Sequence, residues 1–126
     1  MKLLLDTNVL LRWIADAPLP RSVERLLKNP RAEYVISIVS GWEVILKPRL
    51  GVSAAGLETA IKNMGAILLP IKFKHLDALE HLTWIRHHSD PFDRMLIAQA
   101  VAEELPIVTS DERFTAYQGV RVLWDT

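Results

Sequence analysis

The sequence predicts a three-layer α/β/α fold in which a mainly parallel sheet lies between two layers of helices. Short apolar runs that are typical of buried strands alternate with longer stretches of helical periodicity. This alternation favours a parallel sheet, because each helix carries the chain back to start the next strand. The chain has 126 residues, half of them hydrophobic, which fits one domain over residues 1–126 with a substantial core.

Three expected strands are apolar runs followed directly by a polar residue and a helical pattern, at 3–5, 34–38 and 107–109. Two further candidate strands lie at 66–69 and 120–124. Helices are expected at 7–15, 20–28, 41–47, 53–63, 72–86 and 91–104. No linker, repeat or low-complexity segment divides the chain.

Composition and charge exclude several classes of protein. Lys plus Arg and Asp plus Glu number 15 each, so the chain lacks the strong basic excess of many nucleic-acid-binding proteins, although a local basic rim is still compatible with it. The absence of cysteine excludes disulfides and thiolate metal sites and fits a reducing compartment. The N-terminus reaches Asp6 after three leucines, too early for a signal peptide. We therefore expect a cytoplasmic protein with no membrane segment.

Four carboxylates fall where expected strands lead into helices. Asp6 and Asp111 follow strand ends, and Glu43 and Asp93 lie in the first turn of the next helix. Parallel strands deliver their carboxyl ends to one edge of a sheet, where ligand sites form. Clustered carboxylates repel one another and must take up protons or hold a cation. Oxygen ligands favour Mg²⁺ or Mn²⁺, and such an ion is suited to phosphate-ester hydrolysis.

Helix capping is the alternative explanation for each of these acids. Asp6 and Asp111 can each cap a following helix. Residues 40–43 match a capping box in which the glutamate reaches back to the start of its helix. Asp90 and Asp93 have the spacing of an N-cap and an acid at the third helical position. The repeated arrival of an acid at these junctions favours a metal site over caps alone, whereas a cap explains Asp90 fully.

Four segments occur in an order that resembles a known family. They are Leu-Leu-Leu-Asp-Thr-Asn-Val-Leu-Leu at 3–11, Ser-Gly-Trp-Glu at 40–43, His-Ser-Asp-Pro-Phe-Asp-Arg-Met-Leu-Ile-Ala-Gln-Ala at 88–100 and Val-Thr-Ser-Asp-Glu at 108–112. Together they resemble the PIN-domain family, specifically the VapC-type ribonuclease toxins of bacterial toxin–antitoxin pairs. The resemblance extends from Lys2 to Trp124, and Asp-Pro-Phe-Asp-Arg is its most specific segment.

The resemblance implies a Mg²⁺- or Mn²⁺-dependent endoribonuclease, usually a homodimer, that a cognate antitoxin inhibits. The acidic residues of the family correspond here to the same four carboxylates, Asp6, Glu43, Asp93 and Asp111. Thr109 or Ser110 is expected by position to support Asp111 or a bound water. The helices at 20–28 and 53–63 are expected to offer a groove to an antitoxin helix.

The expected reaction is hydrolysis of an RNA phosphodiester bond by a metal-activated water. Asp6 would be the central metal ligand, and Asp93 and Asp111 would complete the metal shell. Glu43 would bind a second metal or orient the attacking water. The candidate substrate-binding residues are Arg94, Asn8 and Ser110.

RNA binding requires positive charge near the acids. Candidates near the expected edge are Arg12, Lys47, Arg49, Arg86 and Arg94. We place Trp13 and Trp42 in the core rather than against RNA bases. We leave His87 and His88 outside the site, as residues of a polar loop.

Two other functions are compatible with parts of this pattern. Aspartyl-phosphate phosphatases also end a strand in an Asp-x-Asp motif, but Asn8 replaces the second acid here and no suitable lysine is evident. A non-catalytic module could use the same fold to bind RNA or a protein. If the protein is such a module, its function should survive the removal of all four carboxylate charges.

Overall fold

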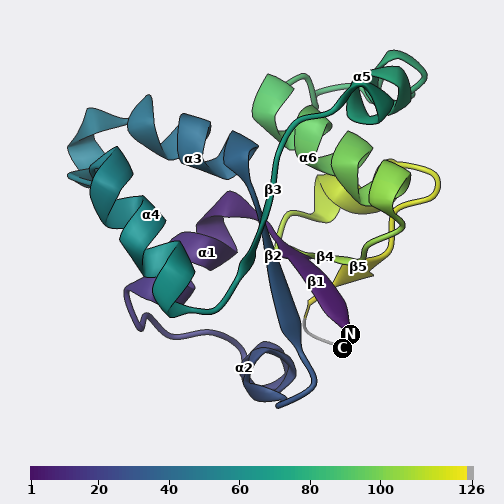
Figure 1. Ribbon diagram of the computed structural model, residues 1–126. Coiled ribbons are helices and arrows are strands. Elements are labelled where there is room, and N and C mark those ends of the chain that lie inside the picture. Colours follow the sequence, from purple (N-terminus) through teal and green to yellow (C-terminus); the bar gives the residue numbers. More distant parts are fainter. Residues whose placement is uncertain (125–126) are drawn as a thin grey trace.

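The computed structural model describes residues 1–124 and contains a five-stranded sheet between two layers of helices (Figure 1). The strands are β1 (Lys2–Leu5), β2 (Glu33–Ser37), β3 (Ile67–Leu69), β4 (Ile107–Val108) and β5 (Val122–Leu123). Their order in the sheet is β3-β2-β1-β4-β5, and each neighbouring pair is parallel. This confirms the predicted α/β/α fold.

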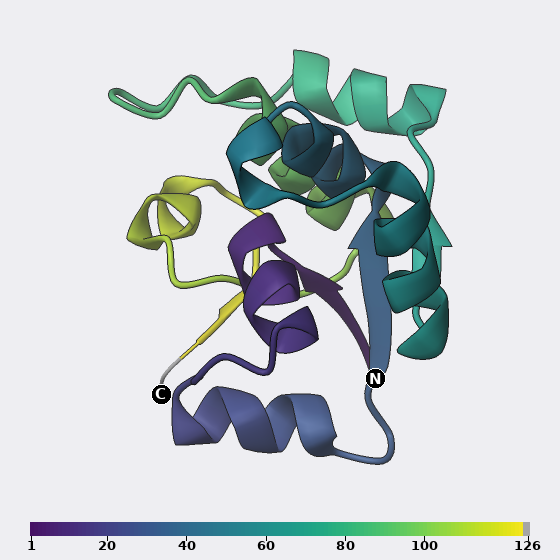
Figure 2. The ribbon, with the colours of Figure 1, turned by 90° about the vertical axis from the view of Figure 1, so that its left-hand side faces the viewer.

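Helices cover both faces of this sheet. The α-helices are α1 (Thr7–Ile14), α2 (Arg21–Lys28), α3 (Ile38–Ile45), α4 (Ala54–Asn63), α5 (Phe73–Glu80) and α6 (Pro91–Glu103), and the 3₁₀ helices are η1 (Pro48–Leu50) and η2 (Glu112–Ala116). Figures 1 and 2 show α1, α2 and α4 on one side of the sheet and α6 with η2 on the other. No helix among residues 1–124 is long and apolar enough to cross a membrane.

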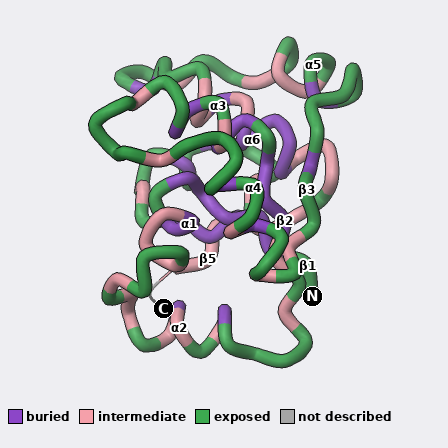
Figure 3. The backbone as a smooth tube through the Cα atoms, turned by 60° about the vertical axis from the view of Figure 1, so that its left-hand side comes forward, coloured by how far each residue is buried: buried purple, intermediate pink, exposed green. Residues whose placement is uncertain are grey.

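Two hydrophobic clusters, one on each face of the sheet, form the core. Leu3 and Leu5 pack in the cluster that includes α1, α2 and α4, whereas Leu4 packs in the cluster that includes α6. Alternate side chains of β1 therefore enter opposite layers, and all three are fully buried. Burial on both faces explains why β1 reads as a continuous apolar run. Figure 3 shows these buried segments at the centre of the molecule.

The order of the strands creates a switch point between β1 and β4. From β1 the chain adds β2 and β3 on one side, and then returns to add β4 and β5 on the other. Ligand sites in such sheets form beyond the carboxyl ends of the strands at this point. Here the Asp6 backbone N–H donates to the Val108 carbonyl at 3.0 Å, which ties the end of β1 to the end of β4.

The start of α3 corrects one sequence prediction. The expected capping box at 40–43 is wrong, because α3 begins at Ile38 and Ser37 is its N-cap, accepting from the Val39 N–H at 3.0 Å. Ser40 instead lies inside the helix, buried, with its hydroxyl 2.9 Å from the Thr7 hydroxyl. Glu43 therefore lies in the second turn of α3, where it does not cap the helix.

The helix expected at 72–86 also ends early, because α5 stops at Glu80. The following loop is fixed by tertiary hydrogen bonds that a helix would not permit. The Arg94 guanidinium donates to the carbonyl oxygens of Leu82 and Thr83, at 3.2 and 2.9 Å. Ile85 and His88 then form an isolated antiparallel bridge.

Candidate active site

Asp6 is held at the end of β1 by two hydrogen bonds from different parts of the chain. Its Oδ1 accepts from the Thr7 backbone N–H at 2.7 Å, and its Oδ2 accepts from the Thr109 hydroxyl at 2.7 Å. The side chain is therefore the N-cap of α1, as the capping explanation predicts. It is also clamped against the segment that follows β4, which a cap does not require.

Burial raises the pKa of Asp6, and the nearby charges of Glu43 and Asp111 raise it further. The hydrogen bonds from Thr109 and Thr7 lower the pKa and only partly offset this effect. No cation pairs with Asp6 among residues 1–124. Glu43 and Asp111 are thus each close enough to Asp6 to repel its charge at the edge predicted from the sequence.

Glu43 reaches the same edge from α3 and is almost fully buried. Its Oε2 accepts from the Lys47 ammonium at 3.1 Å, an ion pair between successive turns of the helix. Its Oε1 is buried and has no hydrogen-bond partner in the described part of the chain. A buried carboxylate oxygen without a partner is costly, so this oxygen is available to a ligand.

Asp93 lies in the first turn of α6. The Asp90 side chain caps this helix by accepting from the Asp93 backbone N–H at 2.9 Å, which confirms the predicted cap. The Asp93 Oδ2 lies 3.1 Å from the His88 Nε2. Burial raises the pKa of Asp93 to about 6, with smaller contributions from the charges of Asp90 and Asp6, while the His88 hydrogen bond opposes the rise.

Asp111 is paired with an arginine that the sequence analysis did not single out. The Arg113 Nε donates to Asp111 Oδ1 at 3.0 Å, and its Nη2 donates to Oδ2 at 2.8 Å. Asp111 is also the N-cap of η2, because Oδ1 accepts from the Arg113 backbone N–H. Hydrogen bonds from Arg113 hold the pKa of Asp111 below its ordinary value.

The structure thus brings four carboxylates together, here called the acidic cluster: Asp6, Glu43, Asp93 and Asp111. The charges of Glu43 and Asp111 act on Asp6. Ligand atoms of Asp93, Asp111 and His88 all lie within 4.8 Å of one another. Lys47 and Arg113 provide two positive charges against four carboxylates. An excess of carboxylate oxygens with one orphaned oxygen fits a hard divalent cation such as Mg²⁺ or Mn²⁺.

Arg94 does not lie where we expected it. Its side chain is buried (4% exposed), and its guanidinium stacks on the Trp84 ring at 3.9 Å and donates to the Tyr117 hydroxyl at 3.3 Å. A guanidinium enclosed by carbonyls and aromatic rings has no free face for RNA. We therefore assign Arg94 to the support of the loop before α6.

The expected core position of Trp42 is also wrong, because its side chain is 57% exposed. It meets Phe92 edge-on, with ring centroids 4.9 Å apart. Trp13, in contrast, packs against the core as expected.

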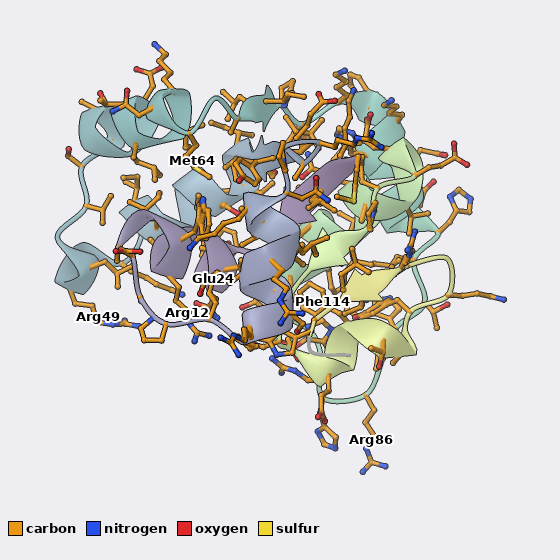
Figure 4. All side chains as sticks on the ribbon, turned by 90° about the horizontal axis from the view of Figure 1, so that it is seen from below. Arg12, Glu24, Arg49, Met64, Arg86 and Phe114 are labelled. Atoms are coloured by element: carbon orange, nitrogen blue, oxygen red, sulfur yellow. The ribbon has the colours of Figure 1, made fainter. Side chains whose placement is uncertain are left out.

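The other candidate RNA contacts are spread over the surface. Asn8 lies two residues after Asp6, Ser110 directly precedes Asp111, and both are exposed. Arg12 donates to the Pro18 carbonyl, and Lys47 is paired with Glu43. Figure 4 shows Arg49 and Arg86 well apart, at the periphery of the molecule.

Two residues that contact the acidic cluster were not placed there from the sequence: His88, which was wrongly left outside the site as a polar-loop residue, and Arg113, which was not considered. The available signals were short spacings: His88 precedes Asp93 by five residues, and Arg113 follows Asp111 by two. Neither spacing is specific alone. The partners that fix His88 come from η2 and the residue after it, which local sequence does not indicate.

Comparisons with known proteins agree with this architecture. None of the curated proteins matches the chain. Similar solved structures include VapBC2 from Rickettsia felis bound to a promoter DNA fragment, with 20% identity and a TM-score of 0.69 over 99% of this chain and 100% of that one. DNA-bound VapBC from Salmonella typhimurium gives 20% identity and a TM-score of 0.70 over 98% and 97%.

VapBC-5 from Mycobacterium tuberculosis is similar as well, with 19% identity and a TM-score of 0.66 over 98% of each chain. At such identities the likeness shows a shared fold. The sequence model of the PIN domain matches residues 3–120, nearly the whole chain. On this match, the chain belongs to the PIN-domain family.

Proposed function

We propose that this chain is a metal-dependent endoribonuclease and the VapC-type toxin of a toxin–antitoxin pair. The observation that carries the proposal is the acidic cluster at the carboxyl edge of the sheet. Two of its members, Asp6 and Asp93, have raised pKa values, and Glu43 presents a buried oxygen without a partner. Membership of the PIN-domain family supports a nuclease.

In this proposal the acidic cluster holds Mg²⁺ or Mn²⁺. Asp6 is the central ligand, Asp93 and Asp111 complete the site, and Glu43 binds a second ion or orients a water. When bound, such an ion neutralises a phosphodiester and lowers the pKa of a coordinated water.

The remaining residues of the site position these ligands. Thr109 and the N-terminus of α1 fix both oxygens of Asp6. Lys47 holds Glu43 Oε2, so that Oε1 is left to accept a proton from an attacking water. Asn8 and Ser110, which are exposed and near Asp6 and Asp111 in the sequence, are proposed to contact RNA.

The proposed antitoxin surface is an apolar groove between α3 and α4 at the β3 edge, with a volume of about 690 Å³. The expected site lay between the helices at 20–28 and 53–63, but α2 lines a separate pocket, with mainly charged side chains and no residue of α4. Exposed Ile38, Trp42, Ile45 and Leu68 line the α3–α4 groove. Covering these side chains with an amphipathic helix would remove apolar surface from water.

We also propose that the protein is a homodimer and that it is located in the cytoplasm.

Cleavage of total RNA tests the nuclease proposal. Wild type should cut RNA with Mg²⁺ or Mn²⁺ and stop in EDTA, and Asp6→Asn and Asp93→Asn should be inactive. Asp90→Asn keeps an N-cap and serves as the matched control, with activity close to that of wild type. Equal cleavage by wild type, Asp6→Asn and Asp93→Asn would contradict the proposal.

A further inference from the structure

His88 is a fully buried histidine beside the acidic cluster. A turn from Ile85 to His88, closed by a 3.1 Å backbone hydrogen bond, places His87 at a φ of 65°. His87 is exposed, whereas the His88 ring lies between aromatic side chains, with centroids 5.5 Å from Phe114 and 5.4 Å from Tyr117. The loop geometry thus delivers one of two adjacent histidines into the protein.

Both ring nitrogens of His88 are engaged. Nδ1 lies 2.7 Å from the Tyr117 hydroxyl, and Nε2 lies 3.1 Å from Asp93 Oδ2. Arg94 can only donate, so its 3.3 Å contact makes the Tyr117 oxygen an acceptor. The Tyr117 proton then goes to His88 Nδ1, which is nearer than the His88 carbonyl oxygen at 3.4 Å.

The hydrogen bonds therefore run in one direction, from Arg94 through Tyr117 and His88 to Asp93. Since Nδ1 accepts, Nε2 carries the ring proton and donates it to the carboxylate. Asp93 Oδ1 accepts no hydrogen bond from the described residues. The chain of contacts thus occupies one oxygen of Asp93 and leaves the other for a ligand.

We propose that His88 is a positioning residue for Asp93, and that Tyr117 and Arg94 lock the His88 tautomer in which Nε2 donates to the Asp93 carboxylate. The inference rests on the proposed function, because it takes Asp93 to be a metal ligand. Outer hydrogen bonds of this kind orient metal-binding side chains, and their loss lowers metal affinity by about 10- to 100-fold.

Direct metal ligation by His88 is the competing role, since its ring lies within 4.8 Å of ligand atoms of Asp93 and Asp111. For that role Nε2 would have to give up its proton and its bond to Asp93, while Tyr117 still occupied Nδ1. The positioning role keeps every buried polar atom of the ring paired.

Nitrogen-15 NMR of the histidine rings tests the tautomer in the intact, metal-free protein. In wild type we expect a proton on Nε2 and none on Nδ1, and in Tyr117→Phe we expect the other tautomer to become populated. Addition of Mg²⁺ should leave the Nε2 proton of wild type in place. A wild-type proton on Nδ1, an unchanged tautomer in Tyr117→Phe, or loss of the Nε2 proton on addition of Mg²⁺ would overturn the proposal.

Mn²⁺ titration of two His88 variants tests the positioning role. His88→Leu removes the donor and should weaken Mn²⁺ binding by about 10- to 100-fold. His88→Gln places an amide N–H near the position of Nε2 and should recover most of the lost affinity. His87→Asn, at the exposed neighbour, is the control and should bind as wild type does. Equal losses in His88→Gln and His88→Leu would overturn positioning by a donated hydrogen bond.

These measurements separate the two proposals. The tautomer is observed without metal or RNA, so it does not depend on nuclease activity. If wild type binds Mn²⁺ but cuts no RNA, the proposed function fails while the role of His88 is still tested by the titration. If wild type does not bind Mn²⁺, both the metal site and the positioning role fail.

Discussion

The Thr109 hydroxyl donates a 2.7 Å hydrogen bond to the Asp6 carboxylate across 103 residues of sequence. The same hydroxyl accepts from the Asp111 backbone N–H at 3.1 Å. One buried side chain thus joins the ends of β1 and β4, the two strands at the switch point of the sheet. The relative position of two proposed metal ligands depends on this contact.

Thr109→Val should destabilise the protein and weaken its metal site. The variant keeps the shape of the side chain but leaves the buried Asp6 Oδ2 without its donor, and a hydrogen bond to a charged group is worth about 1.5 to 3 kcal/mol. Urea unfolding measures the loss. Thr109→Ser keeps the hydroxyl and should retain most of the stability. Equal stability of wild type and Thr109→Val would show that the contact contributes little.

Without metal, stability should fall as pH rises through the range in which Asp93 ionises. Burial raises the pKa of Asp93 from 3.8 to about 6, so the folded protein binds this proton more tightly than the unfolded chain does. The contribution to stability is therefore present below about pH 4 and is lost as pH rises to about 6. Because solvent screens this partly exposed carboxyl, the contribution is on the order of 1 to 2 kcal/mol.

The comparison with Asp93→Asn isolates this effect from other titrating groups. As pH rises from 4 to 7, the free energy of unfolding of wild type should fall relative to that of Asp93→Asn, which has no carboxyl to ionise at this position. EDTA is present in every sample, so that bound metal does not hide the effect. A pH-independent difference would contradict the raised pKa.

Arg113→Gln should increase the affinity of the acidic cluster for Mn²⁺ several-fold. In the metal-free protein Arg113 donates to both oxygens of Asp111 and holds its pKa below the ordinary value. Removal of this cation frees both oxygens and lessens repulsion of the metal. Arg121→Gln, which removes an exposed arginine away from the cluster, is the control. Weaker Mn²⁺ binding in Arg113→Gln would mean that Arg113 organises the site.

Ile45→Lys should disrupt binding of the cognate antitoxin by placing a charge in the α3–α4 groove. The matched control is Leu46→Lys on the next residue, which is also exposed but does not line the groove. Each variant is co-expressed with the tagged antitoxin, and the complex is measured by size-exclusion chromatography. If Ile45→Lys forms the complex as wild type does, the antitoxin binds another surface.

The sequence was sufficient to predict the sheet and the meeting of the four acids. The buried strands are apolar on both faces, so their positions could be recognised locally, and parallel topology then required their carboxyl ends to meet. The register at the start of α3 was ambiguous, because Ser37 and Ser40 are both suitable caps. The buried contact between Ser40 and Thr7 distinguishes them, and it depends on tertiary structure.

The same limit explains the side chains that were misplaced. α3 carries apolar residues around most of its circumference, so no periodicity indicated that Trp42 faces outward. Arg94 was expected to contact RNA because it adjoins Asp93 in the sequence, yet it donates to the carbonyl oxygens of Leu82 and Thr83 and to the Tyr117 hydroxyl. The role of His88 likewise depends on Tyr117, 29 residues away.

Titration of Mn²⁺ into wild type, Asp6→Asn and Asp90→Asn tests most directly whether the acidic cluster is a metal site. Asparagine retains the capping ability of aspartate but removes one charge. We predict that wild type and Asp90→Asn bind Mn²⁺ alike, and that Asp6→Asn loses at least about 10-fold in affinity, as even outer-shell changes do. Removal of the charge relieves the repulsion of Asp6 by Glu43 and Asp111, but the asparagine amide nitrogen cannot accept a hydrogen bond, so one of the two bonds that Asp6 accepts is lost. Metal affinity, rather than stability, is therefore the quantity that tests the site. Equal Mn²⁺ binding by all three proteins, or no Mn²⁺ binding by wild type, would contradict the metal site and leave Asp6 and Asp111 as helix caps.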